Sequence, residues 1–313
     1  MRAVTIAEGR LEVAHRPDPE PGDTELLVAV RAAGVNAADL LQRRGLYPAP
    51  AGVPADIPGL ELAGEVMRTG RRVTRFVPGD RVMAVVGGGA QAELAVVDEA
   101  VAMAVPDLVA WVEAGGFPEA FATAYDALVT QCRLAVGERV LVTGAAGGVG
   151  VAAVQLAVAA GAQVVAAARN PASHGALTEL GARACVPEEA PGLGPYDVVL
   201  ELVGGPGIAQ HLEALATGGR LAVIGVGAGA RVEVDLLALM TRRAVLRGST
   251  LRARPAAEKA AVASALARHV VPLLAAGRLR VPVAATFPLA DASAAYERFA
   301  AGGKFGKIVL VTS

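Results

Sequence analysis

The chain has 313 residues, 54% of them hydrophobic, and a formal net charge of −1. This length allows a large core and predicts two domains. A charge so close to zero excludes a surface built to bind polyanions, so we expect no nucleic-acid partner and no attachment to a membrane. The amino terminus, MRAVTIAEGR, has no apolar signal core, which favours a cytoplasmic protein.

Cysteine and histidine offer little for a disulfide framework or a metal site. Cys132 and Cys185 are the only cysteines and lie far apart, and the four histidines share no ligand spacing. We therefore expect two buried thiols and no bound metal.

The first hundred residues are expected to form short β-strands joined by turns. Asn36 is positioned to cap a short helix that ends near Gly45, and Tyr47 follows in a proline-rich loop. The predicted strands lie in residues 2–13 (a pair), 25–32 and 57–67, and the segment 75–85 places a turn at residues 78–80 before a further strand. Helical spacing begins near Pro106 and continues to Val129. This change of pattern indicates two kinds of domain.

A glycine-rich turn then separates a strand from a helix. Residues 140–143 are predicted to form the strand, Gly144, Gly147, Gly148 and Gly150 the turn, and the alanine-rich helix stops at Gly161. Residues 163–166 form the next strand, as in the opening half of a dinucleotide-binding unit. Glycines let backbone N–H groups and the positive helix end approach a pyrophosphate. A plain strand-to-helix turn needs the same residues, so it is their placement that favours nucleotide binding.

The end of the second strand indicates which cofactor binds. An NAD site carries Asp or Glu about 20 residues after the glycines, where it binds the ribose 2′-hydroxyl. Here the strand ends in Ala168, Arg169 and Asn170, with no carboxylate. A guanidinium at this place suits the 2′-phosphate of NADPH, and the alternative is a solvated loop arginine.

Strands and helices continue to alternate after Arg169. The expected elements are helices closing at 177–181 and spanning 207–216 and 255–276, with strands at 197–203, 220–224 and 244–248. The tail is expected to form a strand (281–287), a helix (291–301) and a strand (306–311). Because the doubly wound unit is already complete, we expect this tail to rejoin the amino-terminal domain.

Six motifs in this order carry a family resemblance: GVNAADLLQRRGLYP, PGLELAGEV, VPGDRVMAV, TGAAGGVGVAAVQLA, GSTLRARP and GKFGKIVL. The whole chain resembles the zinc-independent quinone oxidoreductases of the medium-chain dehydrogenase/reductase superfamily, in particular the tumour-suppressor-inducible branch, with zeta-crystallin nearby. The resemblance implies a GroES-like, β-rich catalytic domain in residues 1–115, a Rossmann domain with a doubly wound parallel sheet in 116–276, and a segment, 277–313, that completes the first domain. It also implies NADPH as cofactor and homodimers or homotetramers, often with sheets joined across the subunit interface.

The resemblance assigns roles to the residues that match the family's motifs. Asn36 and Tyr47 are implied to be polar residues that face the substrate. The residues expected to contact the cofactor are Thr123, Gly144, Ala146, Gly147, Gly148, Val149, Gly150, Arg169, Asn170, Val203, Gly225, Phe305, Gly306 and Lys307. Arg169 and Asn170 are a departure from the family, because relatives often have a lysine or serine set in this loop, which here reads RNPASHG. The chain departs from the family where Gln91 and Leu94 replace a frequent aromatic residue and a tyrosine, so its acceptor pocket is expected to differ in shape.

Zinc-dependent relatives commonly have a ligand cysteine near Asn36 and a histidine in a G-H-E motif, but this chain reads Ala33-Gly34-Val35-Asn36 and Gly59-Leu60-Glu61. Without a Lewis acid, an already electrophilic acceptor such as a quinone suits the site better than an alcohol. The leading hypothesis is an NADPH:quinone oxidoreductase with Asn36 and Tyr47 as hydrogen-bond donors. Two alternatives stay open: an NADPH-dependent reductase of enones or enoyl thioesters, and a non-catalytic, regulatory NADPH-binding protein.

Several of these residues have a simpler interpretation. Asn36 is as well suited to capping its helix as to facing a pocket. Tyr47 could be a packing aromatic residue whose hydroxyl is exposed to solvent. Arg252 and Arg254 follow a strand, where arginines are more often solvated or at an interface than in a binding site.

Overall fold

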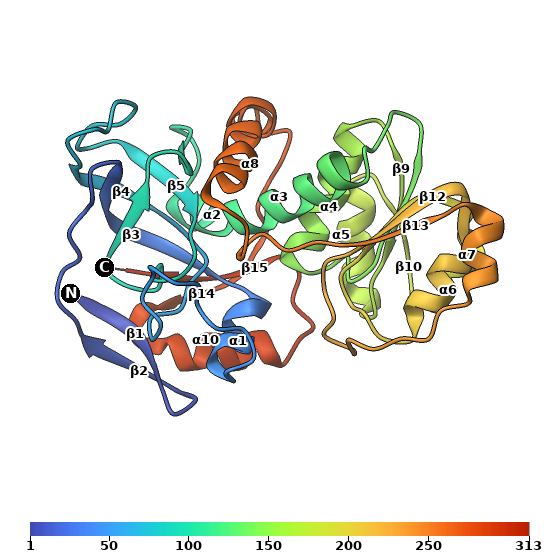
Figure 1. The fold of residues 1–313 in the computed structure, drawn as a ribbon, viewed down its shortest axis with the longest axis horizontal. Coiled ribbons are helices and arrows are strands. Elements are labelled where there is room, and N and C mark those ends of the chain that lie inside the picture. Colours follow the sequence, from blue (N-terminus) through green and yellow to red (C-terminus); the bar gives the residue numbers. More distant parts are fainter. Residues whose placement is uncertain (313) are drawn as a thin grey trace. The chain divides into compact units, whose positions relative to one another are not determined.

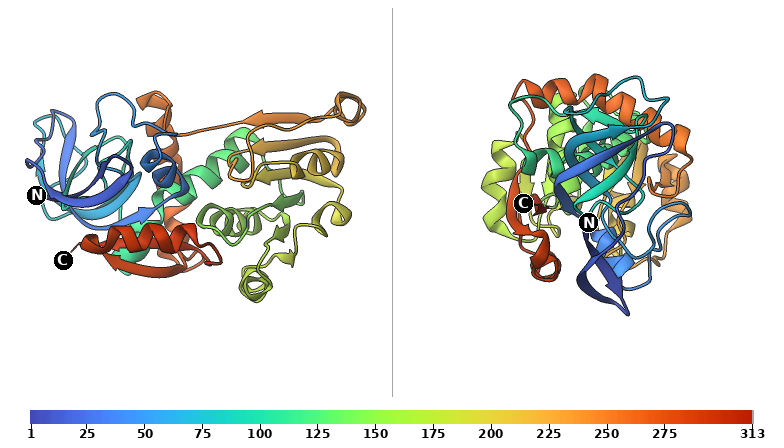
Figure 2. Two further views of the ribbon diagram at one scale, coloured as in Figure 1. Left: turned by 90° about the horizontal axis from the view of Figure 1, so that it is seen from below. Right: turned by 90° about the vertical axis from the view of Figure 1, so that its left-hand side faces the viewer.

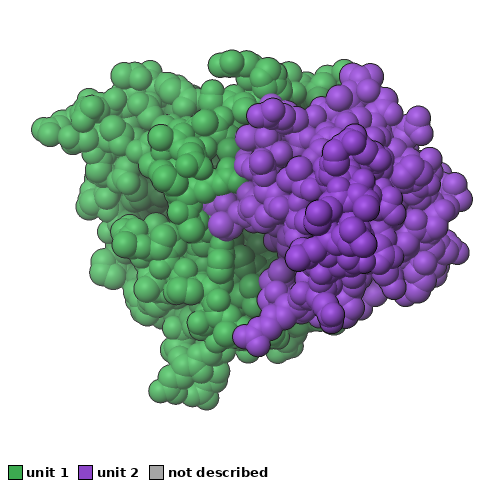
Figure 3. All heavy atoms as spheres, turned by 45° about the vertical axis from the view of Figure 1, so that its right-hand side comes forward, with its two compact units in different colours: residues 1–122, 252–313 green, residues 123–251 purple. Residues whose placement is uncertain are grey.

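A computed structural model describes residues 1–312 and divides the chain into two compact units (Figure 1). Unit 1 combines residues 1–122 with the chain from residue 252 onward, and unit 2 comprises residues 123–251; Figure 3 colours the atoms of each. The predicted boundaries at residues 115 and 276 differ from these. Residues 252–276 lie in unit 1, because helix α8 (Ala256–His269) packs against strand β7 (Ala102–Ala104). Helical spacing alone does not reveal which sheet a helix covers.

Unit 2 contains a six-stranded parallel sheet in the order β10-β9-β8-β11-β12-β13. The strands are β8 (Arg139–Val142), β9 (Gln163–Ala167), β10 (Arg183–Cys185), β11 (Tyr196–Glu201), β12 (Leu215–Val223) and β13 (Val245–Gly248). The helices are α4 (Gly148–Ala159), α5 (His174–Glu179), α6 (Gly207–Glu213) and α7 (Leu236–Arg242), preceded by a π-helical turn at Asp126–Gln131. This is the doubly wound Rossmann order, which reverses direction between β8 and β11.

Unit 1 is built on a seven-stranded sheet in the order β14-β15-β3-β4-β5-β7, with β6 also pairing with β3. Its strands are β3 (Glu25–Val35), β4 (Glu61–Thr69), β5 (Arg81–Val85), β6 (Leu94–Asp98), β7, β14 (Val283–Pro288) and β15 (Lys307–Val311). A separate hairpin joins β1 (Arg2–Ala7) to β2 (Arg10–His15). Its helices are α1 (Ala37–Arg43), α2 (Trp111–Gly116), α8, α9 (Val271–Ala275) and α10 (Ala292–Ala300), and α3 (Pro118–Tyr125) crosses the unit boundary. The unit is the β-rich GroES-like domain that the resemblance implied.

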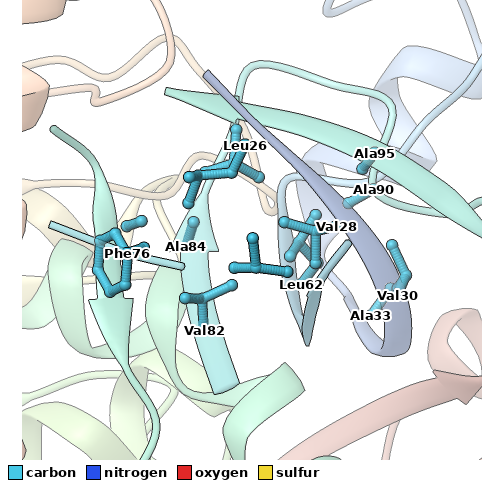
Figure 4. Packing of buried hydrophobic residues seen from close by; sticks show 13 residues of the cluster. Leu26, Val28, Val30, Ala33, Leu62, Phe76, Val82, Ala84, Ala90 and Ala95 are labelled. Atoms are coloured by element: carbon cyan, nitrogen blue, oxygen red, sulfur yellow. The ribbon is translucent and has the colours of Figure 1, made fainter. Parts of the chain in front are cut away.

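The tail rejoins the first unit, as the sequence predicted. β15 pairs antiparallel with β3, so that Ile308 lies opposite Val35, and α10 lies along β14 and β15 (Figure 2). In the hydrophobic core of this sheet, Leu26 and Val28 of β3 pack with Leu62 of β4 and Val82 of β5 (Figure 4). Burying these side chains contributes about 1.5–3 kcal/mol each.

The element boundaries show where periodicity misled the prediction. β12 begins at Leu215, two residues inside the range 207–216 predicted as helix, and β10 and α7 were not predicted at all. The helix expected over residues 255–276 is two helices, which meet at Val270. Pro272 explains this break, because proline lacks an N–H and its ring clashes with the carbonyl four residues earlier. Within residues 1–312, no helix has the length and apolar character needed to cross a bilayer.

Candidate functional site: a nucleotide turn and a buried charged network

The turn between β8 and α4 fits a dinucleotide pyrophosphate. Gly144 has φ of +58°, and a Cβ added to Gly150 would lie 2.5 Å from the carbonyl oxygen of Gly144. The turn and the first turn of α4 therefore touch backbone to backbone, and Gly147, Gly148 and Val149 are partly exposed. The first N–H groups of an α-helix have no partner inside the helix and are available to bind an anion.

Arg169 follows β9, on the carboxyl edge of the sheet, one strand away from this turn. Its side chain is exposed and has no hydrogen bond or ion pair within residues 1–312. Its neighbours are already engaged: Asn170 Oδ1 accepts from Ala172 N at 3.1 Å, and Ser173 Oγ donates to the Asn170 carbonyl at 2.6 Å. Of the side chains in this loop, the Arg169 guanidinium is therefore the one available to bind a phosphate.

Glu201, at the carboxyl end of β11, binds the loop that follows its own strand. Its Oε1 accepts from Thr143 Oγ1 at 2.8 Å, from Val203 N at 2.8 Å and from Gly204 N at 2.9 Å, and its Oε2 lies 2.8 Å from His211 Nδ1. Burial alone raises the pKa of Glu201, but the hydrogen bonds from His211 and the loop outweigh it, so the pKa lies below its usual value. The carboxylate therefore stays ionised although it is only 1% exposed.

Val203 and Gly225 share this edge of the sheet with the glycine turn. A Cβ on Gly144 would lie 3.2 Å from Val203 Cγ2, and one on Gly225 would lie 2.2 Å from the Leu202 carbonyl oxygen. The loops after β8, β11 and β12 are therefore in close contact at the edge where ligands bind in such sheets.

Unit 1 contains a buried charged network around Glu61, the first residue of β4. Lys307 Nζ, from the first residue of β15, donates to Glu61 Oε1 at 2.5 Å and to Asn36 Oδ1 at 2.6 Å. Asn36 Nδ2 donates to the same Glu61 oxygen at 2.9 Å, and Glu119 N donates to Oε2 at 2.8 Å. Gly34 leaves room for the carboxylate, since a Cβ there would overlap Glu61 Oε1. Glu61 is fully buried and Lys307 is 4% exposed, so the charges stabilise each other.

Asp39 extends this network into α1. Its Oδ2 accepts from Asn36 N at 2.7 Å and its Oδ1 from Gly59 N at 3.1 Å. Complete burial raises its pKa from 3.8 to about 7, although both hydrogen bonds and the charge of Lys307 act in the opposite direction. Asp39 thus gains and loses its proton close to neutral pH.

Tyr47 lies in a loop that Arg252 holds in place. The guanidinium donates to the Tyr47 carbonyl at 3.0 Å, to the Gly87 carbonyl at 2.8 Å and to Gln42 Oε1 at 2.7 Å, and it stands 5.0 Å from the centre of the Tyr47 ring. Arg252 is 7% exposed, and burial lowers its pKa. Of the two expectations for Arg252, solvated or at an interface, the first is therefore wrong.

The predicted site residues fall into two groups. Unit 2 contains Thr123, the glycine turn, Arg169, Asn170, Val203 and Gly225, and unit 1 contains Asn36, Tyr47, Phe305, Gly306 and Lys307. Lys307, assigned to the cofactor, and Asn36, assigned to the substrate, are hydrogen-bonded to each other. Both N–H groups of the Asn36 amide already have acceptors, in Glu61 and in the Gly34 carbonyl at 3.4 Å.

Four buried ionisable residues of these hydrogen-bond networks were not predicted from the sequence: Asp39, Glu61, Glu201 and His211. A signal was present for three of them. Glu61 and Glu201 interrupt apolar strand runs, LELAGEV and DVVLELV, and Asp39 stands three residues after an asparagine at the N-cap position of a helix. His211, in α6, becomes recognisable only through its partner.

The residues do not fit a zinc ion. Among residues 1–312, no three His, Cys, Asp or Glu side chains gather as metal ligands. The Glu61 carboxylate is bound by an ammonium, an amide and a backbone N–H, none of which is a metal ligand.

Comparisons with known proteins agree with this architecture. A family model described as alcohol dehydrogenase GroES-like domain matches residues 22–107, and one described as zinc-binding dehydrogenase matches residues 161–310. A quinone oxidoreductase from Lama guanicoe is 31% identical over 99% of this chain and 97% of its own length. The solved quinone oxidoreductase of Thermus thermophilus, described with its NADPH complex, is 35% identical, has a TM-score of 0.86 and is covered over its whole length.

A second group of relatives is much longer. Erythronolide synthase EryA2 from Saccharopolyspora erythraea is 36% identical over 95% of this chain, which spans only 8% of that protein's length.

Proposed function

The chain belongs to the medium-chain dehydrogenase/reductase superfamily, and we propose that it is an NADPH-dependent reductase of quinone-type acceptors. The Thermus and Lama relatives support the reaction type, and the free Arg169 guanidinium supports the phosphorylated cofactor. NADPH, when bound, supplies a hydride from its nicotinamide ring.

The observation that carries the proposal is the Glu61–Lys307 ion pair. An alcohol oxidised by a superfamily member that uses zinc needs a Lewis acid to stabilise the alkoxide. In this chain the ammonium of Lys307 lies 2.5 Å from Glu61, and the described residues provide no ligand set for a metal. A quinone is already electrophilic and spreads the incoming negative charge over conjugated oxygens, so orientation and a hydrogen-bond donor are sufficient.

Different residues of the chain bind the cofactor and orient the acceptor. The turn at Gly144–Gly150 holds the pyrophosphate, and Arg169 pairs with the 2′-phosphate. Tyr47, fixed by Arg252, donates a hydrogen bond to the acceptor's oxygen. The Asn36 amide is already hydrogen-bonded to Glu61 and Lys307, so it is not a second donor to the acceptor. Its role is instead to hold the Glu61 and Lys307 side chains in position.

The similarity to EryA2 favours a second candidate, a reductase of enoyl thioesters. The same hydride geometry applies, but the product needs a proton on carbon, for which the Tyr47 hydroxyl is the candidate donor. Tyr47→Phe separates the two reactions, because quinone reduction loses one hydrogen bond whereas thioester reduction loses its proton donor.

Steady-state assays with a panel of quinones and a panel of enoyl thioesters test the proposal. We expect kcat/KM to be higher for quinones, and a higher value for thioesters would establish the second candidate instead. Tight NADPH binding without oxidation by any acceptor would indicate the non-catalytic alternative.

A further inference from the structure

The Glu201 carboxylate is a buried negative charge that the proposed hydride transfer does not use. No lysine or arginine of the described chain forms an ion pair with it, and His211 Nδ1 is its only ionisable partner, at 2.8 Å. Three of its four hydrogen bonds come from neutral donors in Thr143, Val203 and Gly204. Hydrogen bonds, not an ion pair with a lysine or arginine, keep this buried carboxylate ionised, and buried ionised groups of this kind concentrate at functional sites.

The order of the strands places Glu201 relative to a bound dinucleotide. In a doubly wound sheet the pyrophosphate lies at the glycine turn after the first strand, here β8, and the adenosine ribose lies at the end of the second, here β9 with Arg169. β8 has β9 on one side and β11 on the other. The nicotinamide half therefore extends toward the end of β11, where Glu201 and its loop lie.

We propose that Glu201, held by His211, supports the nicotinamide end of the cofactor site and makes it prefer the oxidised cofactor over the reduced one. This inference rests on the proposed function, because it presupposes that the unit binds NADPH. His211 is a positioning residue that acts through the carboxylate.

The preference follows from the charge of the ring. The nicotinamide of NADP⁺ is cationic and that of NADPH is neutral, so a fixed carboxylate attracts the first and not the second. Because Glu201 is buried, the interaction is screened less than at a surface. Stronger binding of the oxidised form favours hydride donation by the reduced form, in line with a reductase.

The geometry also shows how the loop is shaped. Gly204 and Gly205 have φ of +78° and +72°, a conformation in which the N–H groups of Val203 and Gly204 converge on the Glu201 oxygen. The anion-binding site that this loop forms is thus filled by the protein's own carboxylate. A cofactor phosphate is excluded there and directed to the glycine turn.

Glu201→Gln removes the charge with little change of shape. The glutamine Oε1 accepts the three hydrogen bonds of Thr143, Val203 and Gly204, and its amide group donates to His211 in the other imidazole tautomer. Glu213→Gln, an exposed charge removal two residues beyond His211 in α6, is the matched control.

The test is to measure the dissociation constants of NADP⁺ and NADPH by titration calorimetry at one fixed pH. For Glu201→Gln we expect the ratio Kd(NADP⁺)/Kd(NADPH) to rise about three- to tenfold. Glu213→Gln is expected to keep the wild-type ratio.

The outcomes separate the two claims. An unchanged ratio in Glu201→Gln, including equal weakening of both forms, overturns the inference while the proposed function stands. A rise of similar size in Glu213→Gln also overturns it, since the effect would then be long-range. Wild-type protein that binds neither form overturns the proposed function, and the inference with it.

Discussion

Arg169 is the residue proposed to make the chain prefer NADPH over NADH. Because its guanidinium is exposed and unpaired within residues 1–312, Arg169→Ala is expected to cost about 1–3 kcal/mol of NADPH binding through the loss of one charge-assisted contact. NADH lacks the 2′-phosphate, so its affinity should hardly change. Fluorescence titration with both cofactors measures this, and Arg183→Ala, an exposed arginine of β10, is the control. Equal losses for NADPH and NADH would remove Arg169 from the phosphate site.

Asp39 gives the folded protein a dependence on pH. Its pKa is about 7 when folded and 3.8 in the reference state, so between these values the folded form binds a proton that the unfolded form does not. The resulting stability is complete below pH 3.8 and is lost as the pH rises through 7. From pH about 5 to 8 the free energy of unfolding should therefore fall by a few kcal/mol on account of this residue.

Urea denaturation of wild type and Asp39→Asn tests this dependence. The variant loses one acceptor and is expected to be less stable overall, but its stability should vary less over this pH range. A variant with the same pH slope as wild type would show that Asp39 is ionised throughout.

At the scale of elements, the contact between the β8–α4 turn and α4 depends on the absence of a side chain at Gly150. A Cβ there would lie 2.6 Å from Ala145 Cα and closer still to the Gly144 carbonyl. We expect Gly150→Ala to push the turn away from the helix and to lower NADPH affinity at least about tenfold, as well as the melting temperature. Gly175→Ala, at an exposed helical glycine of α5 with nothing within 4 Å, should leave both unchanged or slightly raise stability. Normal NADPH affinity in Gly150→Ala would contradict the pyrophosphate assignment.

Some of these elements can be predicted from the sequence and others cannot. The strand, turn and helix around Gly150 can be predicted from the local sequence, because the residues that determine each element lie within a few positions of one another. The network of Glu61, Asn36 and Lys307 does not, because it joins residues 271 positions apart that only the pairing of β15 with β3 brings together. Sequence periodicity identifies β3 and β15 as strands but contains no information about their register. Glu201 and His211 are close in sequence, but Glu201 was not predicted as a site residue because it lies within an apolar strand sequence.

At the scale of the whole molecule, unit 2 has an apolar surface at the free edge of its sheet. β13 is the last strand, and its Val245 and Leu246 are 43% and 40% exposed. On the neighbouring helix α7, Leu236 and Met240 are 67% and 71% exposed. Exposed edge strands with apolar side chains pair with other chains unless covered, so we propose that a second copy covers this one.

Sedimentation velocity on Leu246→Glu tests this assembly. We expect wild type to sediment as a dimer or tetramer and the variant as a smaller species, because two copies of the new charge would meet at a symmetric interface. Leu108→Glu, at a 94% exposed position of unit 1, should keep the wild-type assembly. A monomeric wild type would contradict the proposal.

The most direct test of the whole account is the anaerobic reaction of chelator-treated protein with one equivalent of NADPH and an excess of quinone, followed by NADPH absorbance and by metal analysis of the same sample. The account predicts that NADPH is consumed, that one hydroquinone forms per NADPH, and that the rate is the same before and after chelation. A rate that disappears with the chelator and returns with added zinc, or no consumption with any electrophilic acceptor, would contradict it.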